Sequence, residues 1–204
     1  MIALLHTSPV HISRFDKLLE KLGIDQPVKH FVNEKILKKA LETGKIDQEG
    51  FNEEIKKIQK ESPELIICTC STFGAACDLV DGVERIDRPI AEYLVKKYAS
   101  IAIAYTAIST KESSFELVKN TAKRLKKDLS IIEIDCTAFW SYFESGETET
   151  YYQKIANNII STKKDAEAIF LAQASMEPTI AYLSDIGIEV VSSPEYGMKE
   201  ILRG

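Results

Sequence analysis

Short apolar runs alternate with longer amphipathic segments along the whole chain. The runs are β-branched or nearly continuous in apolar character, as in strands of a sheet covered on both faces. Seven strands are expected, at Ile2–His6, Val28–Val32, Leu65–Thr69, Ile101–Tyr105, Ile131–Asp135, Ala168–Ala172 and Ile188–Val191. Between them, apolar side chains recur at helical spacing, for example Phe51, Ile55 and Ile58. This alternation predicts an α/β fold with mostly parallel sheets.

The chain also carries a weak internal repeat. Ile2–Leu5 leads into His-Thr-Ser-Pro and Leu65–Thr69 into Cys-Ser-Thr-Phe-Gly, while Ile101–Tyr105 leads into Thr-Ala-Ile-Ser-Thr and Ala168–Ala172 into Gln-Ala-Ser-Met-Glu-Pro. The repeat predicts two pseudo-symmetric lobes, each a mostly parallel sheet flanked by helices, with an active-site cleft between them. We assign residues 1–98 and 187–204 to the first lobe and residues 99–186 to the second. The C-terminal strand and helix are thus expected to return to the first lobe.

Composition narrows the class of protein. With 204 residues, 45% of them hydrophobic and 28% charged, the chain has a globular balance. No apolar run approaches the ~18 residues of a membrane span, so no membrane association is expected. A net charge of −5 without a Lys/Arg-dense block argues against nucleic acid as a partner. Four cysteines with no recognisable secretory signal predict reduced thiols and a cytoplasmic location.

Ligands of open α/β sheets bind beyond the carboxyl ends of the strands. Four strand–helix junctions carry polar side chains there, and together with free backbone N–H groups they favour a carboxylate or phosphate. These junctions are His6, Thr7 and Ser8; Cys70, Ser71 and Thr72; Thr106, Ser109 and Thr110; and Gln173, Ala174 and Ser175. Any single Ser or Thr could simply cap a helix. Four such junctions together point to a small anionic ligand.

Cys70 is the strongest catalytic candidate. It follows an apolar strand and precedes residues 71–74, which should open a helix. A helix dipole lowers the pKa of a thiol at its N-terminus, so Cys70 could act as a base or a nucleophile. Cys68, Cys77 and Cys136 are instead expected to pack in the core.

Other kinds of site receive little support. The spacing C-x-C-x6-C with only three histidines does not predict a metal site. Glycine-rich phosphate loops and the G-x-S-x-G elbow of serine hydrolases are missing from the sequence, and no cofactor is expected. His6 could orient a substrate or share a proton with Cys70, or it could be a hydrogen-bonded histidine at a sheet edge. The aromatic run Phe139–Phe143 could roof a pocket or pack in the core.

In order and spacing, these motifs resemble the aspartate/glutamate/hydantoin racemase superfamily. Cys70-Ser71-Thr72 is similar to the family's first-lobe Cys-Asn-Thr or Cys-Ser-Ser motif. Leu171–Met176 is similar to a second-lobe motif in which Gln173 stands where a second cysteine would. Thr106 and Ser109 match the family's Gly-Thr-x-Ala-Thr turn. The resemblance covers nearly the whole chain and implies a cofactor-independent enzyme with its site between two lobes.

The resemblance implies a racemase or isomerase acting on the carbon next to a carboxylate of a small acid. In that family two opposed thiols act on the two faces of this carbon, and hydroxyls and backbone N–H groups hold the carboxylate. Cys70 would then be the acid/base. The residues expected around the substrate are His6, Thr7, Ser71, Thr72, Thr106, Ser109, Thr110, Gln173, Ala174 and Ser175. Gln173 has no titratable proton near neutrality, which leaves His6, Glu177 or a water as the second proton donor.

Other interpretations stay open. The chain could be a non-catalytic carboxylate-binding protein that has lost the second cysteine. The resemblance also extends to single-thiol decarboxylases of substituted malonates and to cis–trans isomerases of unsaturated diacids. A thiol-dependent hydrolase would need His6 within hydrogen-bond reach of Cys70. A homodimer is compatible with each of these functions.

Overall fold

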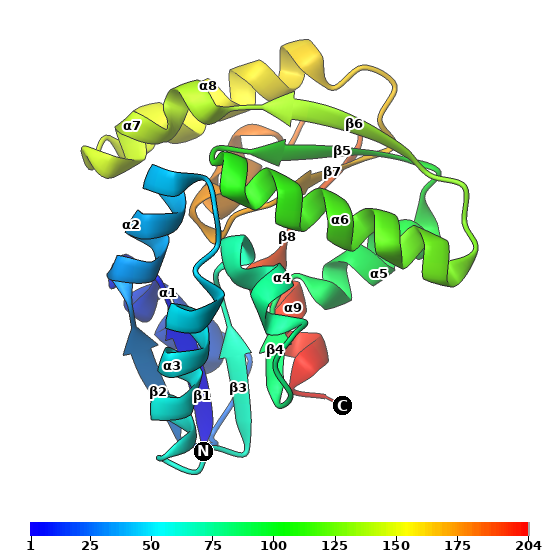
Figure 1. The fold of residues 1–204 in the computed structure, drawn as a ribbon. Helices are drawn as coiled ribbons and strands as arrows, with labels where there is room; N and C mark the ends of the chain where they lie inside the picture. Colours follow the sequence, from blue (N-terminus) through cyan, green and yellow to red (C-terminus); the bar gives the residue numbers. More distant parts are fainter. Residues whose placement is uncertain (204) are drawn as a thin grey trace.

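The computed structural model describes residues 1–203, which form two parallel four-stranded sheets flanked by helices (Figure 1). The strand order is β2-β1-β3-β4 in the first sheet and β6-β5-β7-β8 in the second. Adding four to each strand number of the first order gives the second order, so the two sheets are topological copies of each other. The predicted α/β class with two pseudo-symmetric lobes is confirmed.

The first half of the chain supplies the first sheet and most of the helices around it. Its elements are β1 (Ile2–His6), α1 (Val10–Lys21), β2 (Val28–Val32), α2 (Glu34–Thr43), α3 (Gln48–Gln59), β3 (Leu65–Cys68), a 3-10 turn η1 (Ser71–Phe73), α4 (Gly74–Cys77), β4 (Val83–Arg85) and α5 (Arg88–Lys97). The helix starts follow local capping chemistry. The Asn33 side chain accepts from the N–H of Ile36, and the Asp47 side chain accepts from the N–H of Gly50.

The second half repeats this plan. Its elements are β5 (Ser100–Tyr105), α6 (Ile108–Leu125), β6 (Ser130–Asp135), η2 (Thr137–Phe139), α7 (Trp140–Glu144), α8 (Thr148–Thr162), β7 (Ala168–Leu171), η3 (Ala174–Tyr182), β8 (Glu189–Ser192) and α9 (Ser193–Ile201). The central strands of both sheets are buried along their length because helices cover both faces. β4 was not predicted, since a three-residue strand is too short to show a periodic pattern.

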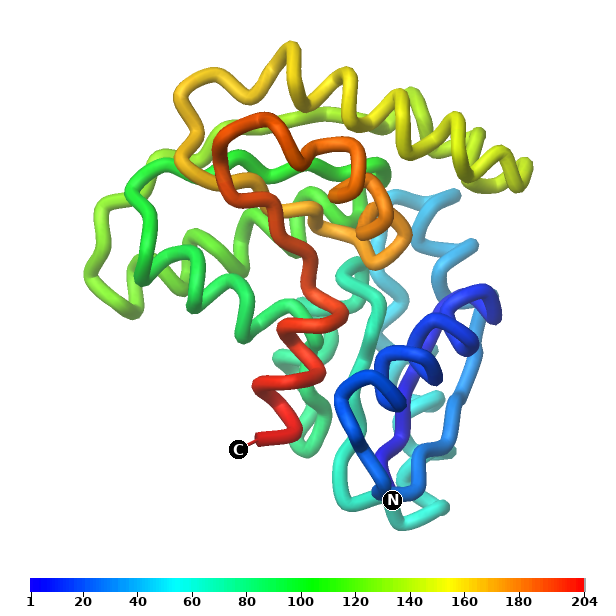
Figure 2. Tube along the Cα trace, turned by 180° about the vertical axis from the view of Figure 1, so that it is seen from behind, coloured from blue at the N-terminus to red at the C-terminus, as the bar shows by residue number. Residues whose placement is uncertain are grey.

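The predicted division of the chain differs from the packing in two places. Strand β8 pairs in parallel with β7 of the second sheet, so it does not return to the first lobe. Helix α5, expected in the first lobe, places Ile90 and Leu94 in the core of the second sheet beside Ile103. Only α9 joins the first lobe, where Met198 packs in the core around β1, as the return of the tube from the second lobe shows (Figure 2). Apolar periodicity shows which residues are buried, but it does not show which sheet they cover.

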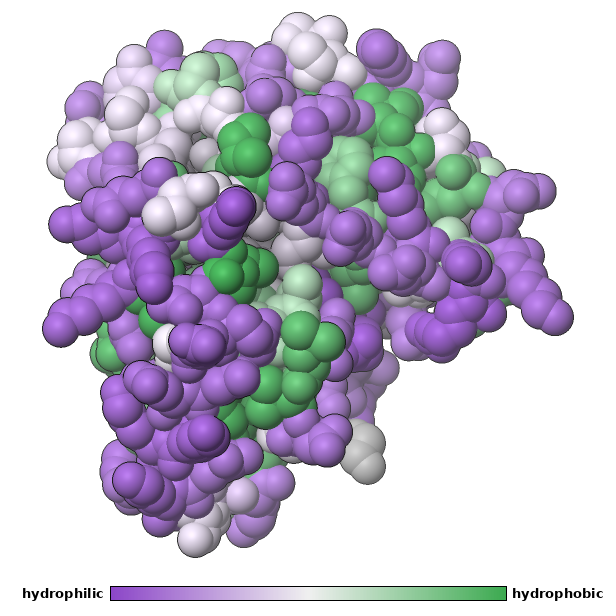
Figure 3. Space-filling view, in the orientation of Figure 1, coloured by the Kyte–Doolittle hydropathy of each residue, from purple (hydrophilic) through white to green (hydrophobic). Residues whose placement is uncertain are grey.

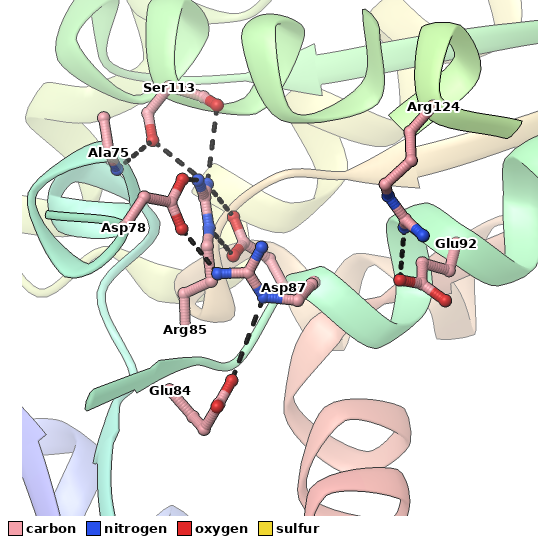
Figure 4. Close-up of polar contacts among 9 residues, drawn as sticks. Ala75, Asp78, Glu84, Arg85, Asp87, Glu92, Ser113 and Arg124 are labelled. Atoms are coloured by element: carbon pink, nitrogen blue, oxygen red, sulfur yellow. Dashed lines mark hydrogen bonds and ion pairs between the residues drawn. The ribbon is translucent and has the colours of Figure 1, made fainter. Parts of the chain in front are cut away.

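A buried ion-pair network joins the lobes on the α4–α6 side (Figure 4). Arg85 of β4 is only 2% exposed and donates to both carboxylate oxygens of Asp87, at 2.7 and 2.9 Å. It also donates to Asp78 at 2.9 Å and to the hydroxyl of Ser113 on α6 at 3.2 Å. A Cβ on Gly74 would lie 2.1 Å from the Arg85 guanidinium, so only glycine fits there. The network ties the segment after Cys70 to the second lobe.

The surface seen in Figure 3 is mostly hydrophilic, and its apolar atoms lie in small separate groups. Within residues 1–203, no helix is both long enough and apolar enough to span a membrane.

Candidate functional site

Cys70 lies in the turn between β3 and η1, where the carboxyl ends of two neighbouring parallel strands meet. The Thr7 side chain, just beyond β1, is hydrogen-bonded to the Cys70 thiol. The backbone N–H and the hydroxyl of Thr72 face the same sulfur. The first two predicted junctions therefore come together around one thiol.

Burial and, to a smaller extent, the nearby Cys68 raise the pKa of the Cys70 thiol to about 11. The hydrogen bonds from Thr7 and Thr72 oppose this shift but do not cancel it. The expected lowering of the pKa was therefore wrong. The helical segment after Cys70 consists of the three-residue η1 and the four-residue α4, which are too short to give a strong dipole. The thiol is protonated at neutral pH.

This protonation state can be measured by alkylation. We expect iodoacetamide to modify Cys70 more slowly than a free cysteine at about pH 8, because only the thiolate reacts. The rate should keep rising with pH beyond the free-cysteine pKa of ~8.5. Mass spectrometry of peptides over a pH series gives the rate at Cys70, with free N-acetylcysteine as the reference. A rate that levels off below about pH 8.5 would contradict the raised pKa.

The third predicted junction meets the Cys70 turn from the other lobe. The Thr72 hydroxyl lies 3.0 Å from that of Thr110 and 3.4 Å from that of Ser109. Both residues belong to the first turn of the 18-residue helix α6, which begins after Ala107 without a side-chain cap. The N–H of Thr110 is bonded to the Ala107 carbonyl at 3.1 Å, but those of Ile108 and Ser109 donate to no atom of residues 1–203, so this end favours an anion. Hydroxyls and free N–H groups thus gather next to Cys70.

The fourth junction forms its own hydrogen-bonded group. The Gln173 side-chain oxygen accepts from the N–H of Thr106 at 2.7 Å and from its hydroxyl at 3.0 Å. The Tyr151 hydroxyl lies 3.0 Å from Thr106 Oγ1 and 3.1 Å from Ser175 Oγ. Sequence analysis missed Tyr151, which reaches this turn from the amphipathic helix α8. The Gln173 oxygen is therefore already bonded within the protein. The side-chain –NH2 donates to no atom of residues 1–203, so it is the part of the amide that can bind a ligand.

Both ring nitrogens of His6 have protein partners, and its role in binding substrate stays a prediction. The residue is fully buried, its Nδ1 lies 2.7 Å from Thr69 Oγ1, and its Nε2 lies 2.8 Å from Nδ1 of His30. His30 Nε2 continues the chain to Asp16 at 2.9 Å. Burial and the neighbouring His30 lower the pKa of His6 to about 3, so it is neutral. With both nitrogens occupied, His6 is not placed to be the base of a thiol hydrolase.

Helix α1 brings Arg14 into contact with the second lobe. Arg14 Nη1 donates to the carbonyl oxygen of Ala174. Burial and the Arg14 charge lower the pKa of His11 to about 4. Burial raises the pKa of Glu177, and the Arg14 charge opposes this shift. The Arg14 contact was not predicted, because nothing in the α1 sequence shows that this side chain reaches η3.

The remaining candidates belong to the core. Cys68, Cys77 and Cys136 are buried in hydrophobic clusters, which confirms the packing role expected for them, and all four cysteines are free thiols. Phe139, Trp140, Tyr142 and Phe143 pack, partly buried, against the second-lobe core. In the described part of the chain, no group of three or more His, Cys, Asp or Glu side chains is placed to hold a metal ion.

The hydroxyls next to Cys70 are closed off from solvent. Thr7, Ser71, Thr72, Ser109 and Thr110 are all buried. A pocket of about 240 Å³ lies between the lobes beside Arg85, and one of about 510 Å³ lies between α5 and α9, and neither is lined by a predicted site residue. Cys70 itself is only partly buried, in contrast to these neighbours.

Solved structures with this fold include three kinds of racemase. A glutamate racemase of Bacillus anthracis matches with a TM-score of 0.75 at 16% identity, over 100% of this chain and 80% of its own. An aspartate racemase of Picrophilus torridus gives 0.72 at 16%, over 95% and 88%. An allantoin racemase of Klebsiella pneumoniae gives 0.66 at 16%, over 99% and 86%. Family models and curated protein sequences give no match. The likeness is one of fold.

Proposed function

We propose that the protein is a cofactor-independent enzyme of the racemase superfamily that transfers a proton at the carbon next to a carboxylate of a small acid. The observation that carries the proposal is the position of Cys70. Its thiol lies among Thr7, Thr72 and the uncapped start of α6, at the junction of the two lobes. The shared fold with racemases of amino acids and of allantoin supports the same chemistry.

The substrate carboxylate would bind the first N–H groups of α6 and the surrounding hydroxyls of Ser71, Thr72, Ser109 and Thr110. As the proton leaves the neighbouring carbon, negative charge spreads onto this carboxylate, where the same donors stabilise it. Cys70 exchanges the proton with that carbon. Because its pKa is about 11, the Cys70 thiol carries a proton that it can donate to the substrate. To act as a base it must first ionise to the thiolate, which is a minor form near neutral pH.

The proton would be removed from, or added to, one face of the carbon only. Gln173 stands where a second thiol would be expected, and an amide neither gives nor takes a proton near neutrality. The combination of one protonated thiol and one amide also favours a second candidate, a single-thiol decarboxylase. There, C–C cleavage of a substituted malonate releases CO2 and leaves an enolate, to which Cys70 delivers its proton.

The test follows the α-proton by NMR in D2O with the enantiomers of aspartate, glutamate and alanine, and follows CO2 release from substituted malonates. We expect Cys70-dependent deuterium uptake with retained configuration, or decarboxylation. Fast inversion by the unmodified protein would contradict one-face chemistry. Stabilisation against heat by an acid, without exchange or CO2 release, would identify a non-catalytic binding protein instead.

The Gln173→Cys variant tests the role of the missing thiol. Placing a thiol opposite Cys70 supplies the second acid/base, so we expect exchange with inversion where the unmodified protein shows retention. Chiral chromatography of the recovered acid measures this outcome. Gln173→Ser is the matched control, because serine is similar in size to cysteine but has no group that titrates near neutrality. Retention in both variants would show that residue 173 does not face the reacting carbon.

A further inference from the structure

Arg14 differs from the other arginines of the chain in having no acidic partner. The chain has five arginines, and four of them, Arg85, Arg88, Arg124 and Arg203, form ion pairs with Asp or Glu. Across residues 1–203, no carboxylate lies within 4.0 Å of the Arg14 guanidinium. A half-buried arginine with no carboxylate bonded to it is poised to bind an anion.

The position of Arg14 relates it to the Cys70 site. It lies about one helical turn into α1, which follows directly on the Thr7 junction, and its Nη1 donates to the Ala174 carbonyl, next to Gln173. This is the one hydrogen bond that α1 makes to the second lobe within the described chain. A guanidinium has five N–H donors, and here a single neutral acceptor is bonded to it. Four donors remain available.

The ionisable groups near Arg14 are either neutral or hydrogen-bonded to other residues, so Arg14 keeps its positive charge without a bonded acidic partner. His11, on the same helix, has its pKa lowered to about 4 and is neutral. Glu177, on η3, is near enough for the Arg14 charge to influence its pKa, but its carboxylate receives a hydrogen bond from Ser192 at 3.1 Å instead. Lys21 and Glu195 pair with each other at 2.7 Å.

We propose that Arg14 is a specificity-determining residue that binds an anionic group at the far end of the substrate, exchanging the Ala174 carbonyl for that anion. This inference rests on the proposed function, in which the α6 end holds the carboxylate next to the reacting carbon. A guanidinium and a carboxylate or phosphate carry opposite charges and can form two parallel hydrogen bonds, so an anion replaces a neutral carbonyl favourably. When Arg14 releases the Ala174 carbonyl, the hydrogen bond between α1 and the second lobe is lost. The contacts of Thr72 and Arg85 with α6 still join the two lobes on the other side.

The test compares acids that differ only in charge at the far end. Exchange of the α-proton is measured for glutamate against glutamine and for O-phosphoserine against serine, so that the two pairs distinguish a carboxylate from a phosphate. In Arg14→Gln we expect kcat/KM for the charged member of the preferred pair to fall by about tenfold to a hundredfold, the loss of one charge-assisted interaction. The uncharged member should be unaffected, and Arg14→Lys should restore part of the preference.

Arg203→Gln, at an exposed ion pair just beyond the C-terminal helix α9, is the matched control and should change neither pair. The proposal is overturned if both members of each pair slow equally in Arg14→Gln, or if the unmodified protein prefers neither charged acid. If no acid exchanges at all, the proposed function fails, and thermal stabilisation by the same four acids decides the role of Arg14. Stabilisation by a charged acid that disappears in Arg14→Gln supports it, and stabilisation that is unchanged or absent overturns it.

Discussion

Replacing Cys70 by alanine is expected to reduce proton transfer to or from the substrate by about 10²- to 10⁴-fold, the usual contribution of a positioned acid/base. The effect should be this large because the other three cysteines are buried in the core and both nitrogens of His6 are occupied. Cys68, the thiol nearest to Cys70, is only 1% exposed, so a substrate does not reach it. Deuterium uptake, or CO2 release, at saturating acid measures the loss.

Cys70→Ser sharpens this experiment, since it keeps the hydrogen bonds of Thr7 and Thr72 but raises the pKa of the donor. It should be as inactive as Cys70→Ala while binding acids normally. Cys136→Ala, which removes a buried thiol from the second-lobe core, is the matched control and should keep its activity per folded molecule. Activity in Cys70→Ala that matches the unmodified protein would remove Cys70 from the mechanism.

Replacing Asp87 by alanine should lower the free energy of unfolding by about 3–5 kcal/mol, as removal of one partner of a buried ion pair typically does. Asp87 is fully buried and receives two hydrogen bonds from Arg85, which would be left with only Asp78 as a counter-charge. The two carboxylates raise the pKa of Arg85, so the guanidinium does not escape by deprotonating. Urea unfolding followed by circular dichroism measures the change.

The control for this variant is an exposed acidic residue close to the same network. Glu84 lies 3.8 Å from Arg88, and both side chains are more than 40% exposed, so Glu84→Gln should change stability by less than about 0.5 kcal/mol. Equal effects of Asp87→Ala and Glu84→Gln would show that the buried pair does not hold the lobes together.

Local sequence patterns were sufficient for the architecture of the lobes. The predicted bounds of Ile2–His6 and Val28–Val32 match β1 and β2, of which the first is a nearly continuous apolar run and the second has valines at both ends. The repeat of strand and polar turn also led to the two-lobed fold. These features depend on neighbours in the chain, so one sequence displays them.

The parts of the candidate site that could not be predicted depend on contacts between distant segments. The pKa of Cys70 depends on burial and on the weak dipole of the short segments η1 and α4. Residues 71–77 alone do not reveal where that helical segment ends. His6 faces His30, and Arg14 faces Ala174, across 24 and 160 positions of sequence. Such pairings follow from how the sheets and lobes pack, which periodicity does not encode.

The exchange of helices between the lobes has a consequence for any attempt to divide the protein. Residues 1–98 would carry α5 without the sheet that it covers, and they would lack α9, whose Met198 fills the core beneath β1. Residues 99–204 would in turn expose the face of the second sheet that α5 protects. A cut between residues 98 and 99 therefore leaves each half without a helix that covers its own core.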